Sequence, residues 1–391
     1  MAARRRPVRI GIVAGEVSGD LLGAGLIRAL KKRLPEVRFE GVCGERMEAE
    51  GCRSMFPMEW LSIFGLVEAV GKYPQIQWMR RDLIKHFLSD PPDLFIGVDV
   101  PDFNLGLEKR LRRAGIATVH YVSPTVWAWR SYRIHKIKKA VDRMLTLFPF
   151  EARYYEQHQL PVTFVGHPLA DQIDDSVDQV SMRGRLGLPK KNATVIALLP
   201  GSRANELKRH GRLFVETALW LYRRNPTMHF VVPLVNSDIR AMFEDAIAAS
   251  RAEDLPITRL DGQSRDAMAA ADVVLLASGT AALEAALLRR LMVVTYKVSL
   301  ITYLLITSFA HVKLFSLPNN LLGREVVPEL IQQDAVPEKL GTAVEYYLTH
   351  PEKAQSVGEE LREIGVQLRR NANERAAEAV LEVLKTQSGR P

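Results

Sequence analysis

Two aspartates in the segment GVDVPDFN, residues 97–104, are the side chains best suited to acid–base chemistry. The segment follows an apolar stretch that predicts a strand, and Pro101 fixes the turn between the two carboxylates. Ligands of doubly wound proteins bind at the carboxyl ends of parallel strands, so a carboxylate here can act as a general base. We expect Asp99 to have that role, although it could merely end the strand, and we expect Asp102 to cap the next helix. No histidine or further carboxylate follows at ligand spacing, so a metal pair is not predicted.

A second loop, GEVSGD at residues 15–20, stands between a predicted strand at 8–14 and a predicted helix at 21–33. Its glycines let a ligand approach the backbone, and the helix that follows attracts anions to its N-terminus. The spacing is not G-x-G-x-x-G, so the dinucleotide-binding fingerprint is not met. Contact with a ligand and simple capping of the helix by Asp20 both remain open for this loop.

Two further loops combine small residues with a following helix, which is the arrangement that binds phosphate. LPGSR at residues 199–203 adds an arginine, so its backbone N–H groups and Arg203 suit a diphosphate. SGTAALE at residues 278–284 offers hydroxyls and N–H groups, and Glu284, one turn into the helix, could accept hydrogen bonds from a ribose. Each loop alone is a weak signal. Both follow strands of one predicted sheet, however, and together they predict a nucleotide site.

Two tryptophans, Trp127 and Trp129, stand in a loop after a predicted strand, where they are costly to expose. They could pack in the core, on a sugar ring or on an acyl chain. The basic residues that follow could form a solvated face or could hold a phosphate or an acidic membrane. The apolar stretch at residues 55–70, MFPMEWLSIFGLVEAV, is open to two similar interpretations: a buried helix, or a surface that enters a lipid interface.

Short β-branched runs alternate with amphipathic stretches along most of the chain, which is typical of parallel α/β layers. An acidic, aperiodic stretch at 171–179 divides two such patterns. We therefore predict two Rossmann-like, doubly wound domains that face each other across a cleft, at 1–170 and 185–350. Helices at 351–391 are expected to pack back on the first domain or on a partner. The predicted strands are 8–14, 38–42, 94–98, 117–122, 143–147 and 163–165, then 194–198, 229–233, 257–260, 273–276 and 293–296.

The composition of the 391 residues excludes several classes of protein. Apolar residues make up 47% and charged residues 25%, which argues against a disordered or fibrous chain. The net charge of +8 favours anionic partners: nucleic acid, phosphorylated substrates or an acidic membrane surface. The longest uncharged runs, 114–129 and 298–312, are too short and too polar to span a bilayer, and no signal-peptide core follows the N-terminal arginines. Cys43 and Cys52 cannot build a disulfide framework, so we expect a reducing, cytosolic compartment.

Seven segments together resemble the lipid-A-disaccharide synthases, the bacterial glycosyltransferases of lipid A assembly. They are GEVSGD at 15–20, GVDVPDFN at 97–104, YVSPTVWAWR at 121–130, VGHPLAD at 165–171, LLPGSRANEL at 198–207, ASGTAALEAAL at 277–287 and SLPNNLLGRE at 316–325. They fall in the order of the family, with no large block inserted or missing. The one visible departure is Val100, where the family more often has a small residue.

The resemblance implies a glycosyltransferase-B fold whose second domain holds most of the sugar nucleotide. The implied reaction is an inverting condensation of UDP-2,3-diacylglucosamine with 2,3-diacylglucosamine 1-phosphate, which gives the β-1,6-linked disaccharide 1-phosphate and UDP. We expect Asp99, with Glu16 as the alternative, to be the catalytic base, and we expect no metal or cofactor. The expected UDP-sugar residues are Gly201, Ser202, Arg203, Ser278, Gly279, Thr280, Glu284, Asn319 and Arg324.

Because both implied substrates carry acyl chains, the resemblance also favours surfaces that face lipid. The residues expected to contact the acceptor or the membrane are Ser18, Gly19, Ile63, Phe64, Leu66, Val67, Trp127, Trp129 and Arg130. We expect a cytoplasmic protein that binds peripherally to the inner face of the inner membrane, with a homodimer also open. The nearest alternative is a UDP-N-acetylglucosamine epimerase or another glycosyltransferase of the same fold. A nucleic-acid-binding protein would rest on charge alone, because no binding motif is present, so no nucleic-acid partner is expected.

Overall fold

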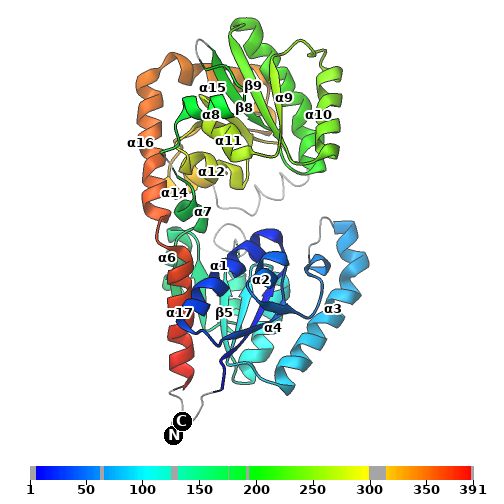
Figure 1. Ribbon diagram of the computed structural model, residues 1–391, viewed down its shortest axis with the longest axis vertical. Coiled ribbons are helices and arrows are strands. Elements are labelled where there is room, and N and C mark those ends of the chain that lie inside the picture. The colour runs from blue at the N-terminus through cyan, green and yellow to red at the C-terminus, as the bar shows by residue number, and fades with distance from the viewer. Residues whose placement is uncertain are drawn as a thin grey trace. The chain divides into compact units, whose positions relative to one another are not determined.

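The computed structural model describes residues 6–61, 66–124, 131–174, 176–190, 193–298 and 314–388, without the side chains of 66–72, 131 and 388. The chain divides into two compact units. We call Met1–Asp171 with Leu368–Pro391 the N-terminal unit, and Gln172–Gln367 the C-terminal unit. Each unit is a parallel sheet with helices on both faces (Figure 1), which confirms the predicted α/β class. Within the described residues, no helix is both long and apolar enough to cross a membrane.

The sheet of the N-terminal unit has seven parallel strands in the order β3-β2-β1-β4-β5-β6-β7. Their bounds are β1 (Arg9–Ala14), β2 (Arg38–Val42), β3 (Cys52–Ser54), β4 (Leu94–Val98), β5 (Ala117–Tyr121), β6 (Arg143–Thr146) and β7 (Val162–Phe164). The central strands are almost wholly apolar because helices cover both faces, and all five residues of β4 are buried. The strand order reverses between β1 and β4. The carboxyl ends of these two strands therefore form the topological switch point, where such sheets bind ligands.

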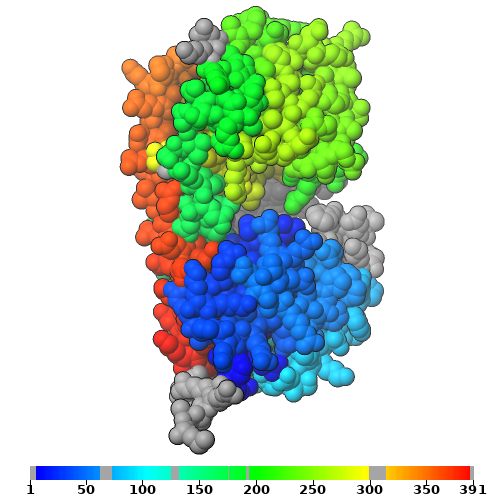
Figure 2. Space-filling view, viewed as in Figure 1, coloured from blue at the N-terminus to red at the C-terminus, as the bar shows by residue number. Residues whose placement is uncertain are grey.

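The helices of this unit cover both faces of the sheet (Figure 1). The helices are α1 (Val17–Arg33), α2 (Glu45–Ala49), α3 (Leu66–Ser89), α4 (Pro101–Arg113), α5 (Ile134–Lys138), α6 (Pro149–Gln157), α7 (Pro168–Gln172) and α17 (Ala372–Ser388). On one face, α1 and α17 bury Leu26 and Val380 in a single core. On the other face, α3 and α4 pack around Phe87 and Phe95. Helix α17 lies directly beside the N-terminal residues of the unit in Figure 2, in agreement with its contacts to α1.

The C-terminal unit repeats this design with six parallel strands in the order β10-β9-β8-β11-β12-β13. The strands are β8 (Thr194–Leu199), β9 (Met228–Leu234), β10 (Ile257–Asp261), β11 (Val273–Ala277), β12 (Leu291–Tyr296) and β13 (Glu329–Ile331). The helices are α8 (Gln179–Arg185), α9 (Ala204–Arg224), α10 (Ser237–Ala249), α11 (Ser264–Ala270), α12 (Thr280–Leu287), α14 (Leu317–Leu322), α15 (Pro337–Thr349) and α16 (Pro351–Leu368). The order reverses between β8 and β11, so the switch point of this unit lies at the ends of those strands.

The two C-terminal helices divide between the units. Helix α16 lies almost entirely in the C-terminal unit, whereas α17 begins beyond Leu368 and belongs to the N-terminal unit. Asp171 fixes the start of α17, because its carboxylate accepts hydrogen bonds from the backbone N–H groups of Arg370, Asn371 and Ala372 at 3.1, 3.0 and 2.6 Å. A carboxylate in this position satisfies donors that the first turn of a helix otherwise leaves unpaired.

Several local predictions differ from the structure. Helix α1 begins at Val17, so Asp20 lies inside it, and its buried carboxylate instead accepts hydrogen bonds from the N–H groups that begin α2. Helix α4 begins at Pro101, and Asp102 makes no capping bond. The sequence also did not predict the short strand β3, nor that Cys43 and Cys52 are joined by a disulfide.

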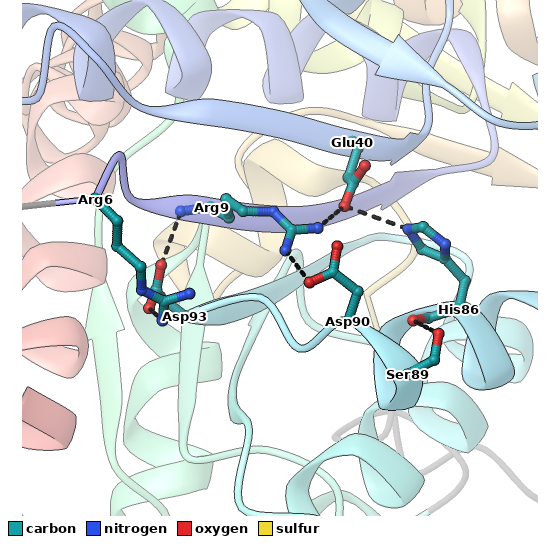
Figure 3. Close-up of polar contacts among 7 residues, drawn as sticks. All are labelled: Arg6, Arg9, Glu40, His86, Ser89, Asp90 and Asp93. Atoms are coloured by element: carbon teal, nitrogen blue, oxygen red, sulfur yellow. Dashed lines mark hydrogen bonds and ion pairs between the residues drawn. The ribbon is translucent and has the colours of Figure 1, made fainter.

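A polar network lies at the amino ends of the strands, opposite the switch point of the N-terminal unit (Figure 3). The guanidinium of Arg9 is 2.7 Å from Glu40 and 2.5 Å from Asp90, and His86 Nε2 is 3.3 Å from the same Glu40 oxygen. The backbone N–H of Arg9 donates to Asp93 at 2.9 Å. These contacts tie β1 and β2 to the end of α3, which gives the network a role in stability.

Candidate functional site

The backbone after β4 is strained at two consecutive residues. Asp99 has φ 54° and Val100 has φ 43°, and Val122, after the neighbouring strand β5, has φ 82°. A left-handed backbone conformation costs a residue other than glycine about 1–2 kcal/mol, and this cost is greatest for a β-branched residue such as valine. Strained backbone of this kind is concentrated at functional sites, where the surrounding structure holds it in place.

Hydrogen bonds from neighbouring elements hold the strained turn. The N–H of Asp99 donates to the carbonyl of Tyr121 in β5 at 2.8 Å, and Asn104 Nδ2 donates to the carbonyl of Asp99 at 2.8 Å. From the β1 side, Gly15 lies so close that a Cβ there would be 2.5 Å from Val100 Cγ2 and 2.9 Å from Leu61 Cβ. The GEVSGD loop and the Asp99–Val100 turn therefore lie directly against each other at the switch point.

The two aspartates of this segment have different surroundings. Asp102 is exposed and forms an ion pair with Arg133. Asp99 is half-buried, and its carboxylate has no hydrogen bond or ion pair within the described part of the chain. Glu16 is exposed at the N-cap of α1. The arrangement thus leaves Asp99 as a carboxylate that can take a proton from a ligand.

The predicted contacts with acceptor and membrane lie in part outside the described residues. Ser18 is exposed, and Gly19 is buried where a Cβ would lie 3.5 Å from the carbonyl oxygen of Val98. Leu66 and Val67 begin α3, but their side chains are not described. The other predicted contacts, Ile63, Phe64, Trp127, Trp129 and Arg130, are not among the described residues.

An aromatic cluster joins the apolar stretch at 55–70 to α3, and the sequence prediction did not include its α3 member, Trp78. Phe56, Trp60 and Trp78 have ring centroids 5.5–6.4 Å apart, and Trp78 is 54% exposed. Tyr73, five residues earlier in α3, is 61% exposed. Exposed tryptophan and tyrosine side chains are typical of regions that contact lipid headgroups or another apolar ligand.

The two predicted phosphate loops of the C-terminal unit follow adjacent strands. Leu199 at the end of β8 is in register with Leu276 of β11, so the loops that follow them begin side by side. Gly201 has φ 129°, and a Cβ there would be 2.5 Å from Glu206 Cβ, so this position requires glycine. The side chain of Arg203 is 67% exposed and lies 4.0 Å from Glu206, which leaves its guanidinium accessible to an anion.

Glu206 changes the expected use of the first loop. Its carboxylate accepts hydrogen bonds from the N–H groups of Ser202 and Arg203 at 3.0 and 3.3 Å. It therefore occupies the anion-binding position at the N-terminus of α9, which the sequence prediction had given to a diphosphate. A signal was present in the sequence, because Glu206 stands three residues after Arg203, as in a capping box.

The second loop is more open. The N–H of Ser278 donates to the carbonyl of Thr295 at 3.0 Å, but the N-cap residue is Gly279, which has no side chain to cap the helix. A Cβ on Gly279 would meet no atom of the described residues within 4 Å. Gly279 and Thr280 are both exposed. The N-terminus of α12 can therefore be approached by an anion.

The remaining residues predicted to bind the UDP-sugar take part in contacts within the protein. Glu284 forms an ion pair with Arg265 at 3.3 Å, and Arg324 forms one with Glu360 at 2.5 Å. Asn319 is fully buried. Its Nδ2 donates to Val327 O and to the Glu329 carboxylate, and its Oδ1 accepts from two backbone N–H groups. All hydrogen-bonding positions of Asn319 are thus used within the protein, so it holds its loop in place and has no atom left for a ligand.

Two buried histidines have pKa values below the ordinary value. Burial lowers the pKa of His167 to about 4, and its Nδ1 accepts a hydrogen bond from the N–H of Leu169 at 3.2 Å. Burial also lowers the pKa of His210, whose Nε2 accepts from the N–H of Lys297 at 2.9 Å. Both rings accept hydrogen bonds as neutral imidazoles, which suits structural roles at neutral pH.

Comparison with known proteins gives consistent matches over nearly the whole chain. The sequence profile of the lipid-A-disaccharide synthetase family matches residues 10–383. The lipid-A-disaccharide synthase of Hahella chejuensis is 50% identical over 380 residues, covering 97% of this chain and 95% of that protein. The synthase of Aeromonas hydrophila is 50% identical over 378 residues, covering 97% of this chain and 99% of that protein.

Solved structures of low sequence identity share the fold. UDP-GlcNAc 2-epimerase from Neisseria meningitidis, bound to UDP-GlcNAc, aligns with a TM-score of 0.63 and 13% identity, over 97% of this chain and 100% of that chain. Anabaena HepE, in complex with UDP and glucose, aligns with a TM-score of 0.57 and 12% identity over the same shares. The fold is therefore that of the glycosyltransferase-B class, with two Rossmann-like units.

Proposed function

The chain belongs to the lipid-A-disaccharide synthase family, a family of glycosyltransferases, and from this premise we propose that it joins two acylated glucosamines. The donor is UDP-2,3-diacylglucosamine, and the acceptor is 2,3-diacylglucosamine 1-phosphate. The products are the β-1,6-linked disaccharide 1-phosphate and UDP.

Asp99 is the general base in this proposal. Its carboxylate takes the proton of the acceptor's primary hydroxyl while that oxygen forms a bond to the anomeric carbon of the donor. The bond from the anomeric carbon to the diphosphate breaks in the same step, so the configuration inverts and UDP leaves. The observation that carries the proposal is the half-buried carboxylate of Asp99, which has no hydrogen bond or ion pair to any described residue and stands on a strained turn at the switch point.

The leaving diphosphate needs positive charge, and the C-terminal unit has two sources of it. One is the exposed guanidinium of Arg203, and the other is the N-terminus of α12, where Gly279 and Thr280 are exposed. Together they can stabilise the developing charge on UDP without a metal ion. Glu284 is the candidate for the ribose hydroxyls, in exchange for its ion pair with Arg265.

The reaction itself is tested by incubating the protein with both acylated substrates and measuring the mass of the lipid product. We expect the disaccharide 1-phosphate together with UDP. Consumption of the UDP-sugar without a disaccharide would instead indicate an epimerase, which has the same fold.

The base is tested with Asp99→Ala and the matched control Asp102→Asn, three residues along the chain. Asp99→Ala should keep the affinity for UDP and lose about 10²-fold or more in turnover. Asp102→Asn should keep turnover, because the Asp102 side chain is exposed and its partner within the described residues is Arg133, a surface ion pair. If Asp99→Ala retains near-wild-type turnover and Glu16→Gln does not, the base is Glu16.

Peripheral membrane binding at the inner face of the inner membrane follows from the acylated substrates, the net charge of +8 and the exposed aromatic side chains of α3. Binding to anionic vesicles should weaken as salt is raised. Replacing Ile63, Phe64, Leu66 and Val67 by serine should reduce sedimentation with these vesicles. Serine at Val180 and Val235, which are 52% and 53% exposed in the other unit, is the matched control and should not.

A further inference from the structure

Three buried polar side chains lie beneath the strained Asp99–Val100 turn. Asn104 and Glu108 stand one helical turn apart in α4, His120 is in β5, and all three are fully buried. His120 Nδ1 is 2.7 Å from Glu108 Oε1. Burial raises the pKa of Glu108, although the neighbouring histidine acts in the opposite direction. Burying a titratable pair costs desolvation free energy, and the chemistry proposed above does not use this pair.

Asn104 links the turn to two strands. Its Nδ2 lies 2.8 Å from the carbonyl oxygen of Asp99, 3.2 Å from that of Val13 in β1 and 3.4 Å from that of Val98 in β4. The ends of the two switch-point strands and the turn itself thus converge on one amide group. A left-handed valine is unfavourable by itself, so such a link is what keeps the turn in its strained form.

Glu108 and His120 fix the helix that carries Asn104. A Cβ at Gly97 would lie 2.2 Å from Glu108 Oε1 and 2.9 Å from Asn104 Cβ, so the carboxyl group lies against the backbone of β4, two residues before Asp99. His120 is the register neighbour of Gly97 in β5. The pair therefore joins α4 to β4 and β5 next to the turn.

We propose that Asn104, Glu108 and His120 are positioning residues that hold the left-handed Asp99–Val100 turn and so keep the carboxylate of Asp99 at the switch point. This inference rests on the proposed role of Asp99 as the base. Removing any of the three relaxes the turn and displaces the carboxylate, while the UDP site in the other unit is untouched.

The test compares Asn104→Ala and Glu108→Ala with the matched control Leu107→Ala, a fully buried residue of the same helix. We expect the first two to lower kcat by about 10- to 10²-fold, since small displacements of a reacting group cost about that much. Their Kd for UDP should stay within about twofold of wild type. Leu107→Ala should lower Tm as much as the other two but leave kcat close to wild type, because it removes only apolar packing. Glu108→Gln, which retains an oxygen for His120, should restore most of the kcat lost in Glu108→Ala.

Asp99→Asn, assayed in parallel, separates this inference from the function on which it rests. If Asp99→Asn retains turnover, the proposed base is wrong. If Asp99→Asn is inactive while folded Asn104→Ala and Glu108→Ala keep wild-type kcat, the positioning role is wrong and the base stands. If the alanine variants do not fold, Gly97→Ala is the replacement test. It adds one methyl group on β4, which pushes the Glu108 carboxyl group away from the strand. Wild-type kcat in folded Gly97→Ala would also overturn the inference.

Discussion

The neutral, buried imidazole of His167 predicts how the stability of the N-terminal unit depends on pH. The ring is 9% exposed, its Nδ1 accepts the N–H of Leu169, and it packs 5.6 Å from the ring of Phe148. Burial lowers its pKa from 6.5 to about 4. Between these two pH values the histidine is protonated in the unfolded chain but neutral in the folded unit. The stability that the neutral ring contributes is therefore complete above pH 6.5 and is lost as the pH falls toward 4.

The size of the effect follows from the two pKa values. At about pH 5 the unfolded histidine is almost fully protonated and the folded one is mostly neutral, which lowers the free energy of unfolding by about 2 kcal/mol relative to neutral pH. His167→Asn removes this proton uptake and keeps a side-chain oxygen in reach of the N–H of Leu169. The variant will start from a lower stability, because it leaves a cavity, but its stability should change less with pH.

Urea unfolding followed by tryptophan fluorescence measures this difference. Four of the five tryptophans stand within Met1–Asp171, so a Trp220→Phe background makes the signal specific to the N-terminal unit. In that background, the gap in the free energy of unfolding between His167 and His167→Asn should narrow by about 2 kcal/mol from pH 7.5 to pH 5. A gap that stays constant over this range would show that His167 is not held neutral by burial, and the reasoning would be refuted.

Three further predictions concern stability and the nucleotide loop. Burial tends to raise the pKa of Glu40, but hydrogen bonds from Arg9 and His86 lower it below the ordinary value. Arg9→Met should therefore lower the free energy of unfolding by about 1–3 kcal/mol near neutral pH. Urea titrations should show this loss becoming smaller as the pH falls through the pKa of Glu40, because a protonated carboxyl needs no counter-charge. Gly201→Ala should destabilise the loop before α9 and weaken UDP binding measured by calorimetry, because the added methyl would lie 2.5 Å from Glu206 Cβ at a φ of 129°. An unchanged Tm and an unchanged Kd for UDP would show that alanine fits this position without strain. Asp171→Ala should cost about 0.5–2 kcal/mol, with faster hydrogen exchange at the first amides of α17 and no change in α15.

The sequence predicted the strands better than the roles of individual side chains. The runs at 38–42 and 94–98 coincide with β2 and β4. The second was the clearer prediction, because a strand covered on both faces is a nearly continuous apolar run and all five residues of β4 are buried. Helix starts were less well predicted, since Asp20 has the residue type of an N-cap but its carboxylate caps a different helix, α2. Such long-range pairing is not visible in local spacing.

Local spacing also did not reveal which polar groups are already used inside the protein. The segment LPGSR has the composition of a phosphate loop, but Glu206 already binds its N–H groups. Asn319 stands in a motif of the family, but both ends of its side-chain amide already form hydrogen bonds within the protein. His120 lies within a mostly apolar strand, which is a local sign of a buried polar group, but its partner Glu108 became apparent only in the structure. Which polar atoms remain free for a ligand is a property of the packed structure.

The anomeric configuration of the product tests the central claim most directly. The purified protein is incubated with UDP-2,3-diacylglucosamine and 2,3-diacylglucosamine 1-phosphate, and the new linkage is determined by NMR alongside the amount of UDP released. The single displacement assigned to Asp99 predicts a β-1,6 linkage and one UDP for each disaccharide. An α linkage, or UDP released without a disaccharide, would contradict it.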